Sequence, residues 1–228
     1  FILNSSDIKK DLDFIDKYNY MDYNYPNASN LVMLSSSKLY EPAPIIGSTA
    51  TRYITGKTIS EFNSIISTYH DDEYTKNLKI LEKYLFDNDI KNVAIFRLGC
   101  VSGYDLHEAP GFLPEMIRCA SKDENFQLWD YYDGKQVRDY LHYHDLVRAI
   151  EKTKELEYHN ILWLNIGGGI NNSISIMELY GYLQFVGVPI RYTKRTSLVN
   201  YECCKAKPHY ISDIRNAKEL LKWNPNYT

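Results

Sequence analysis

The sequence predicts an α/β fold in which short buried strands form a parallel sheet. Three almost entirely apolar runs, Leu31–Leu34, Asn92–Leu98 and Ile161–Ile166, have the length and composition of strands that are covered on both faces. Between the first two lies Glu73–Phe86, whose apolar residues recur at helical spacing. Strands separated by amphipathic helices are typical of α/β architecture. A chain of 228 residues allows one ordinary domain, or one with a small added lobe.

Composition excludes several classes of protein. The net charge of −3 gives no basic surface for nucleic acid, and no apolar run reaches the roughly 20 residues of a membrane span. The four cysteines fit neither a disulfide framework nor the spacing of a zinc site. We therefore expect a cytoplasmic protein that binds neither nucleic acid nor membrane.

In the first half of the chain, helices are expected on both sides of the first strand. Asp7–Tyr18 has apolar residues at helical spacing, and Tyr20–Asn30, rich in Asn and Pro, is predicted to be a loop. The strand at Leu31–Leu34 is followed by a cluster of serines, a composition that is common in turns. The apolar stripe of the helix Glu73–Phe86 consists of Tyr74, Leu78, Leu81 and Leu85.

The second half continues with short strands and helices. Ser173 or Ser175 can cap a helix over Ile176–Val186. The other predicted elements are a helix ending at Cys119, a strand at Phe126–Trp129, a helix at Asp145–Thr153, a strand at Pro189–Tyr192 and a helix at Ala217–Leu221.

The stretch Gly134–Asp145 is dense in polar and cationic side chains. Arg138 offers a rigid fork of donors that suits a pair of phosphate oxygens, and Asp139 can hold that fork in place. The alternative is a surface hairpin followed by a helix. A strand would place His142 and His144 on one face, but we expect no metal there.

Several segments resemble the nucleotide-sugar epimerases and dehydratases, the extended short-chain dehydrogenase family. The stretch Gly134–Asp145 is similar to the family pattern G-K-Q-V-R-D-x-x-H-x-x-D. The other similar segments, in the family's order, are Ser35–Tyr40, Arg97–Gly103, Asn165–Gly169 and Tyr210–Pro225. The branch that the chain resembles most is that of CDP-paratose 2-epimerase, which has a cysteine at the position of Cys100.

The resemblance implies a Rossmann-like fold and NAD as cofactor. Residues 1–103, with part of 138–167, would belong to the NAD-binding domain, and residues 104–228 mostly to the lobe that binds the nucleotide sugar. About a hundred residues of the usual Rossmann half, including the glycine-rich loop that cradles the cofactor pyrophosphate, would be missing. The chain alone is therefore expected to bind NAD no better than millimolar.

The implied reaction is a transient oxidation of a sugar hydroxyl, with return of the hydride to the other face. Tyr74 would be the base and Ser36 its hydroxyl partner. Tyr53 is the rival base, because Tyr53 and Lys57 form the only Tyr-x-x-x-Lys of the chain. On a helix, that spacing places the ammonium on the face of the tyrosine, where it would stabilise a tyrosinate.

The choice of Tyr74 leaves Leu78 at the position where the family has a lysine. Without that charge, Tyr74 would titrate nearer its unperturbed pKa of about 10 and would be a poor base near pH 7. Replacing Leu78 by lysine is therefore expected to restore activity in a full-length protein.

The resemblance also implies contacts to both ligands. Arg138 would contact the nucleotide phosphates, and Cys100 and Phe112 would line the sugar-nucleotide pocket. Leu98 and Tyr40 would contact the cofactor. The expected substrate is a nucleotide-diphosphate sugar, in particular a CDP-sugar.

The arginine that binds the diphosphate in the family has no direct counterpart here, and a glycine run is a second candidate for a phosphate site. The arginine that clamps the diphosphate in the family falls on Cys203, although Lys205 or Lys207 could replace its charge. Gly167–Gly169 follows a strand and could bind phosphate, which is a weak signal without further spaced glycines. In the family this run is a structural turn.

Two hypotheses of different class remain open from the sequence. The first is an NAD-dependent nucleotide-sugar epimerase, and the second a catalytically inactive relative that binds a nucleotide sugar or a protein, which Leu78 and Cys203 favour. A homodimer is expected through the helices near 7–18 and 73–86, with Tyr84 and Phe86 as anchors.

Overall fold

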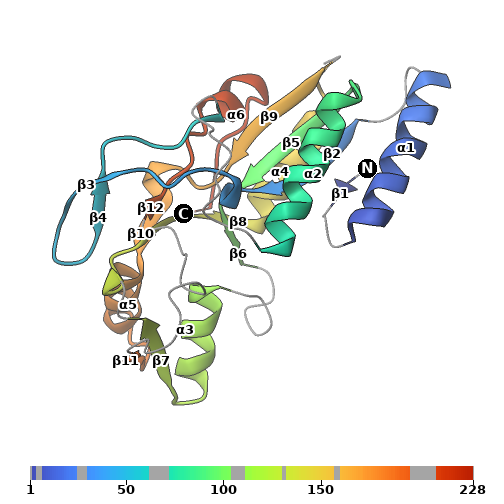
Figure 1. The fold of residues 1–228 in the computed structure, drawn as a ribbon. Coiled ribbons are helices and arrows are strands. Elements are labelled where there is room, and N and C mark those ends of the chain that lie inside the picture. Colours follow the sequence, from blue (N-terminus) through green and yellow to red (C-terminus); the bar gives the residue numbers. More distant parts are fainter. Residues whose placement is uncertain are drawn as a thin grey trace.

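The computed structural model describes residues 2–3, 7–24, 30–61, 72–103, 111–129, 132–156, 160–195 and 209–227. A twisted parallel sheet with helices on its faces forms the larger region, and short strands with α3 and α5 form a smaller one beneath it (Figure 1). The predicted Rossmann-like α/β fold is confirmed. None of the helices in the described ranges is long and apolar enough to cross a membrane.

The larger sheet has four parallel strands in the order β1-β2-β5-β9. Their bounds are Ile2–Leu3, Leu31–Ser36, Val93–Leu98 and Ile161–Ile166. The three apolar runs of the sequence thus form β2, β5 and β9, which are the neighbouring strands of one sheet. Alternate side chains of these strands enter two separate hydrophobic clusters, because helices cover both faces.

One face of this sheet is covered by α1, Ile8–Asn24, and α2, Glu73–Asp87. The first helix extends beyond the predicted Tyr18 and takes in part of the expected loop. Residues 19–24 contain neither glycine nor proline, so nothing in them ends the helix before Pro26. Asp72 caps α2, because its carboxylate accepts the N–H of Thr75 at 2.8 Å.

A second sheet is built around β8, Val137–His142. Three short strands pair with β8: β6, Cys100–Ser102; β10, Ser173–Ser175; and β12, His209–Tyr210. Val137, Asp139 and Leu141 are buried and alternate with half-exposed residues. The alternative of a surface hairpin is therefore wrong for this stretch, although the expected helix follows as α4, Tyr143–Thr153.

The remaining elements frame these two sheets. Ser175 begins α5 with a capping box that includes Glu178, as its position before an apolar run predicts. The strand expected from Pro189 begins at Arg191. The bounds are α3, Phe112–Ser121; β7, Asn125–Trp129; α5, Ile176–Phe185; β11, Arg191–Arg195; α6, Arg215–Leu220; the hairpin β3, Ile45–Ser48, and β4, Tyr53–Thr55; and two 3-10 turns, η1, Ser37–Leu39, and η4, Ile170–Asn172.

The chain crosses between the two sheets more than once. It leaves the larger sheet after β5, builds β6 and β8 of the smaller one, and returns to the larger sheet as β9. The division of the chain into residues 1–103 and 104–228, with part of 138–167 in the first unit, stays a prediction.

Candidate functional site

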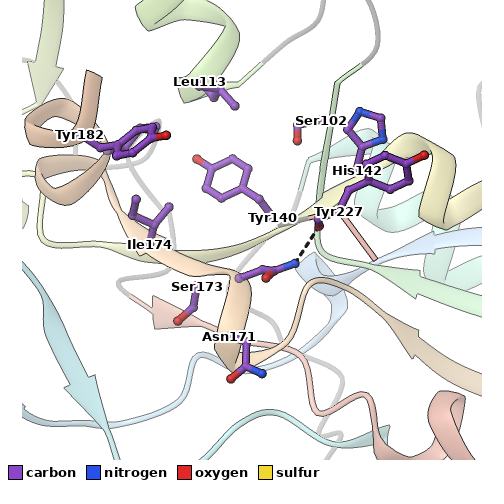
Figure 2. A pocket seen from close by; sticks show the side chains of 11 residues that line it. Ser102, Leu113, Tyr140, His142, Asn171, Ser173, Ile174, Tyr182 and Tyr227 are labelled. Atoms are coloured by element: carbon purple, nitrogen blue, oxygen red, sulfur yellow. Dashed lines mark hydrogen bonds between the residues drawn. The ribbon is translucent and has the colours of Figure 1, made fainter. Parts of the chain in front are cut away.

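A cavity of about 510 Å³ lies over the half-exposed face of β8. We call it the tyrosine pocket, because Tyr140, Tyr182 and Tyr227 reach it from β8, α5 and the C-terminal segment (Figure 2). Leu113 of α3 lies across from Tyr140, and His142 borders Tyr227. The full lining is Ser102, Leu113, Tyr140, His142, Asn171, Asn172, Ser173, Ile174, Leu179, Tyr182 and Tyr227.

The wall formed by Tyr227 is fixed through its backbone. The N–H groups of Asn226 and Tyr227 each donate to the buried Asp145 carboxylate at 3.0 Å, and Asn172 donates to the Tyr227 carbonyl at 3.1 Å. The Tyr227 ring stacks on His142 with centroids 4.6 Å apart. No local pattern marks this wall, since its contacts join residues far apart in the chain.

The side chains of His142 and His144 contact the backbone and neighbouring aromatic rings. His142 caps α4, because its Nδ1 accepts the N–H of His144 at 3.3 Å. In the ranges that the structure describes, no group of three or more His, Cys, Asp or Glu residues could hold a metal ion.

Two guanidinium groups gather beside the pocket around His209. Arg52, from the β3–β4 hairpin, donates to Ser173 Oγ at 3.1 Å and lies 3.7 Å from the Glu178 carboxylate. His209 is almost fully buried, and burial together with the positive charges of Arg52 and Arg138 lowers its pKa to about 4. Because Ser173 lines the tyrosine pocket, this cationic cluster of Arg52, Arg138 and His209 adjoins it.

Asp139 does not hold the guanidinium of Arg138, which corrects the expectation from the sequence. Neighbouring residues of a strand point to opposite faces, and Asp139 is fully buried while Arg138 is not. Asp139 accepts the N–H groups of Gly169 at 3.1 Å and Ser212 at 3.2 Å. Arg138 donates instead to the carbonyl of Val137 at 2.7 Å. Burial raises the pKa of Asp139.

The glycine run Gly167–Gly169 is closed to phosphate. A Cβ on Gly167 would lie 2.3 Å from Asp139 Oδ2, and one on Gly168 would lie 2.0 Å from the carbonyl oxygen of Tyr140. The glycines are needed because β8 and the Ser212 segment approach the backbone here. The run is therefore a structural turn, and this loop does not supply a cradle for the cofactor pyrophosphate.

The residues expected to do the chemistry lie at the carboxyl end of β2 and in the first turn of α2. Ser36 ends β2, where its Oγ accepts the N–H of Lys38 at 3.2 Å. Tyr74 lies in the first turn of α2 with 40% of its surface exposed. Leu78, one turn further, is completely buried in the core of α1, α2 and the sheet. The ammonium of Lys38, which sequence reasoning missed, lies beside the Tyr74 ring.

The rival tyrosine has a different setting. Tyr53 lies on β4, and Lys57 follows that strand outside any helix. The argument that four residues place an ammonium beside a tyrosine holds for helices only. The Tyr53 ring packs edge-on against Tyr132, with centroids 5.9 Å apart.

Tyr40 belongs to a buried polar network at the same edge of the sheet. Its hydroxyl donates to Asn165 Oδ1 at 2.6 Å, and the guanidinium of Arg97 lies 4.9 Å from its ring centroid. Arg97 also donates twice to Glu82, at 2.6 and 3.2 Å. Burial raises the pKa of Tyr40 to about 12. With 1% of its surface exposed, Tyr40 is buried at the edge of the sheet. Leu98, at the end of β5, is only partly buried.

The other expected pocket residues differ in their positions. Cys100 is paired with Tyr140 in register on β6, and burial raises the pKa of its thiol to about 11, so it is protonated near pH 7. Phe112 packs into the core of the smaller region, while its neighbour Leu113 lines the tyrosine pocket. Cys203, Lys205 and Lys207 lie outside the described residues.

Known proteins with similar folds bind nucleotide sugars. The chain matches MoeE5, solved with UDP-glucuronic acid and NAD, with a TM-score of 0.69 at 20% identity, over 94% of this chain and 65% of that one. It matches UDP-glucuronic acid 4-epimerase from Bacillus cereus with a TM-score of 0.68 at 18% identity, over 87% of this chain and 57% of that one. Identities this low show the shared fold alone.

Similarity in sequence goes further. The chain is 27% identical to dTDP-4-dehydro-6-deoxy-D-allose reductase from Streptomyces sp, over 86% of its own length and 56% of the reductase. It therefore spans little more than half the length of this relative. The sequence profile of the NAD dependent epimerase/dehydratase family matches residues 19–156, which is more than half of the chain. The chain belongs to the NAD dependent epimerase/dehydratase family.

Proposed function

We propose that the chain contributes the substrate pocket and the catalytic edge of an NAD-dependent nucleotide-sugar epimerase of the CDP-paratose 2-epimerase type. The observation that carries the proposal is the tyrosine pocket with the cationic cluster beside it. Aromatic walls suit the faces of a base and a sugar, and paired guanidinium groups suit a diphosphate. A nucleotide-diphosphate sugar contains all three parts.

The cluster offers a replacement for the diphosphate clamp that the sequence lacks. In the proposed complex, Arg138 contacts one phosphate and Arg52 the other. Arg52 is held by Ser173 and Glu178, so its fork is oriented before a ligand binds. Burial and the charges of Arg52 and Arg138 keep His209 neutral, and a bound diphosphate would offset those charges.

The proposed chemistry takes place at the carboxyl ends of β2 and β5. The tyrosinate of Tyr74 takes the proton of a sugar hydroxyl, and Ser36 hydrogen-bonds the same oxygen. When bound, NAD would supply the acceptor for the hydride from that carbon and its donor on return to the other face. The glycine run Gly167–Gly169 does not fit the pyrophosphate of that cofactor.

Calorimetry with CDP, CMP and cytidine tests the substrate class without any need for NAD. We expect CDP to bind at least about tenfold more tightly than cytidine, because each charge-assisted contact contributes about 1.5–3 kcal/mol. Arg138→Gln should remove most of that advantage. Arg118→Gln is the matched control, since Arg118 pairs with Glu115 on α3 and lies outside the pocket lining.

Equal affinity for CDP and cytidine, or equal effects of the two arginine substitutions, would contradict the proposal. Competition between CDP and UDP then tests the choice of base, because the cytosine-specific part of the proposal rests on the resemblance alone.

The enzyme is favoured over a catalytically inactive binding module, because the relatives with similar sequence or fold carry the names of enzymes. The proposed assembly is a homodimer through the outer faces of α1 and α2, on which Phe86 is 64% exposed. A cytoplasmic location is part of the same proposal, in keeping with nucleotide sugars as substrates.

A further inference from the structure

The ring of Tyr74 has a cation beside it that does not come from its own helix. Leu78, one turn along α2, is completely buried among apolar side chains and brings no charge. The ammonium of Lys38, two residues after Ser36, lies 5.6 Å from the centroid of the Tyr74 ring. We propose that Lys38 supplies, from the turn after β2, the positive charge that stabilises the tyrosinate of Tyr74. This inference rests on the proposed role of Tyr74 as the base.

The backbone places Lys38 in this position. Ser36 caps the turn η1 by accepting the N–H of Lys38 at 3.2 Å, which fixes where the lysine leaves the chain. Ser36, the proposed hydroxyl partner, and Lys38 therefore belong to one turn. A lysine at position 78 would reach it from the helix interior, where Leu78 is buried.

A second contact holds the ammonium at the start of α2. Lys38 Nζ lies 3.5 Å from Asp72, the residue that caps α2, and both side chains are about half exposed. Partial burial acts to raise the pKa of Asp72, but the hydrogen bonds from Thr75 and the charge of Lys38 outweigh it and lower that pKa below 3.8. Asp72 is therefore ionised near pH 7 and retains the lysine.

The size of the effect follows from exposure and from the opposing charge of Asp72. An exposed ion pair at this range is screened by solvent, so Lys38 should shift the Tyr74 titration by about half a unit to one unit. Among the described residues, the first turns of α2 also carry the charges of Glu73 and Lys76. At the start of the adjacent helix α1, Asp7 and Lys10 pair with each other at 3.1 Å.

In the proposed reaction, the O–H bond of the sugar breaks and a new O–H bond forms on Tyr74, which becomes neutral. The proton returns to the sugar oxygen when the hydride is returned, so the tyrosinate is regenerated. Lys38 does not touch the substrate in this scheme. It is a positioning residue that acts through the charge state of Tyr74.

The test is a fluorine NMR titration of the protein with 3-fluorotyrosine at position 74, which reports ionisation of that side chain without cofactor or substrate. Lys38→Met should raise the titration midpoint by about 0.5–1 pH unit. Lys38→Arg keeps the charge and should restore the original midpoint. Lys79→Met is the matched control, because Lys79 belongs to the same helix but lines a different cavity, and it should leave the midpoint unchanged.

Equal midpoints for the protein and Lys38→Met would overturn the inference, and so would an equal shift in Lys79→Met. These outcomes are separate from those of the nucleotide titration. A shifted midpoint in a protein that does not bind CDP supports the role of Lys38 and removes the proposed substrate. Binding of CDP without any shift removes the role of Lys38 alone.

Discussion

Asp139 is a single residue on which the second sheet depends. Its carboxylate satisfies the N–H groups of Gly169 and Ser212, while its Oδ1 accepts no hydrogen bond from the described residues. Asp139→Ala should lower the free energy of unfolding by about 2–4 kcal/mol, because two buried donors lose their acceptor. Asp139→Asn keeps an acceptor and should cost less than about 1 kcal/mol at pH 7. Urea unfolding measures both, and equal losses would contradict this role.

Asp139 should make the free energy of unfolding depend on pH in a definite direction. Burial raises the pKa of Asp139 above 3.8 in the folded state, so the fold favours the protonated form. Its contribution to stability is complete at acid pH and is lost as the pH rises through the raised pKa. Relative to Asp139→Asn, the protein should therefore lose stability from about pH 4 upwards. Urea unfolding at several pH values should show parallel curves if this is wrong.

His209 should have the opposite effect. Its folded pKa of about 4 lies below the ordinary 6.5, so the unfolded chain takes up a proton first on acidification. The protein should lose up to about 3 kcal/mol of stability between pH 6.5 and pH 4 through this group. His209→Gln cannot be protonated and should lack that part of the acid sensitivity. An unchanged pH profile in the variant would contradict the buried neutral imidazole.

Within α2, the burial of Leu78 predicts that a lysine at this position should not act as the catalytic lysine. Leu78→Lys would place an ammonium among Ile15, Leu31 and Leu81 in the core, so it should cost at least about 3 kcal/mol and should not activate the enzyme. This revises the expectation from the sequence. Asn77→Lys, on the partly exposed face one residue earlier, should change stability by less than about 0.5 kcal/mol. Thermal unfolding of both variants checks the contrast.

Elements with a strong local pattern could be predicted from the sequence. β2, β5 and β9 are apolar runs of strand length, and Ser175 precedes a helix with Glu178 at the right spacing for a capping box. The extension of α1 beyond Tyr18 could not, because polar residues such as those at 19–24 are found in loops and on helices alike.

Most of the candidate site depends on contacts between distant residues. Arg52 meets Ser173 across 121 positions, and Tyr227 meets Asp145 across 82. Ser36, Tyr74 and Arg138 were proposed because they fit a family pattern. No local pattern marks Lys38, Arg52 or Tyr227, since only the fold brings them to their partners.

At the scale of the whole molecule, the outer face of α2 predicts a homodimer. Phe86 and Ile80 are 64% and 50% exposed, and Tyr84 is directed to α1, where it donates to Asp16 at 2.5 Å. Phe86→Lys should convert a dimer into a monomer at tens of micromolar in light scattering, because it places a charge in an apolar interface. Phe185→Lys is the control, since Phe185 is also an exposed phenylalanine, at 88%, but lies on α5. A monomer before substitution would contradict the dimer.

We propose that a nucleotide diphosphate binds beside the tyrosine pocket, at Arg52, Arg138 and His209. The most direct measurement is the pKa of His209 by NMR, with and without saturating CDP and with His209→Gln to assign the signal. Burial, the larger cause of the low pKa, would remain, but the phosphates would offset the positive charges of the two arginines, so the pKa should rise above about 4. An unchanged or lower pKa in the protein saturated with CDP would contradict a diphosphate at these three residues.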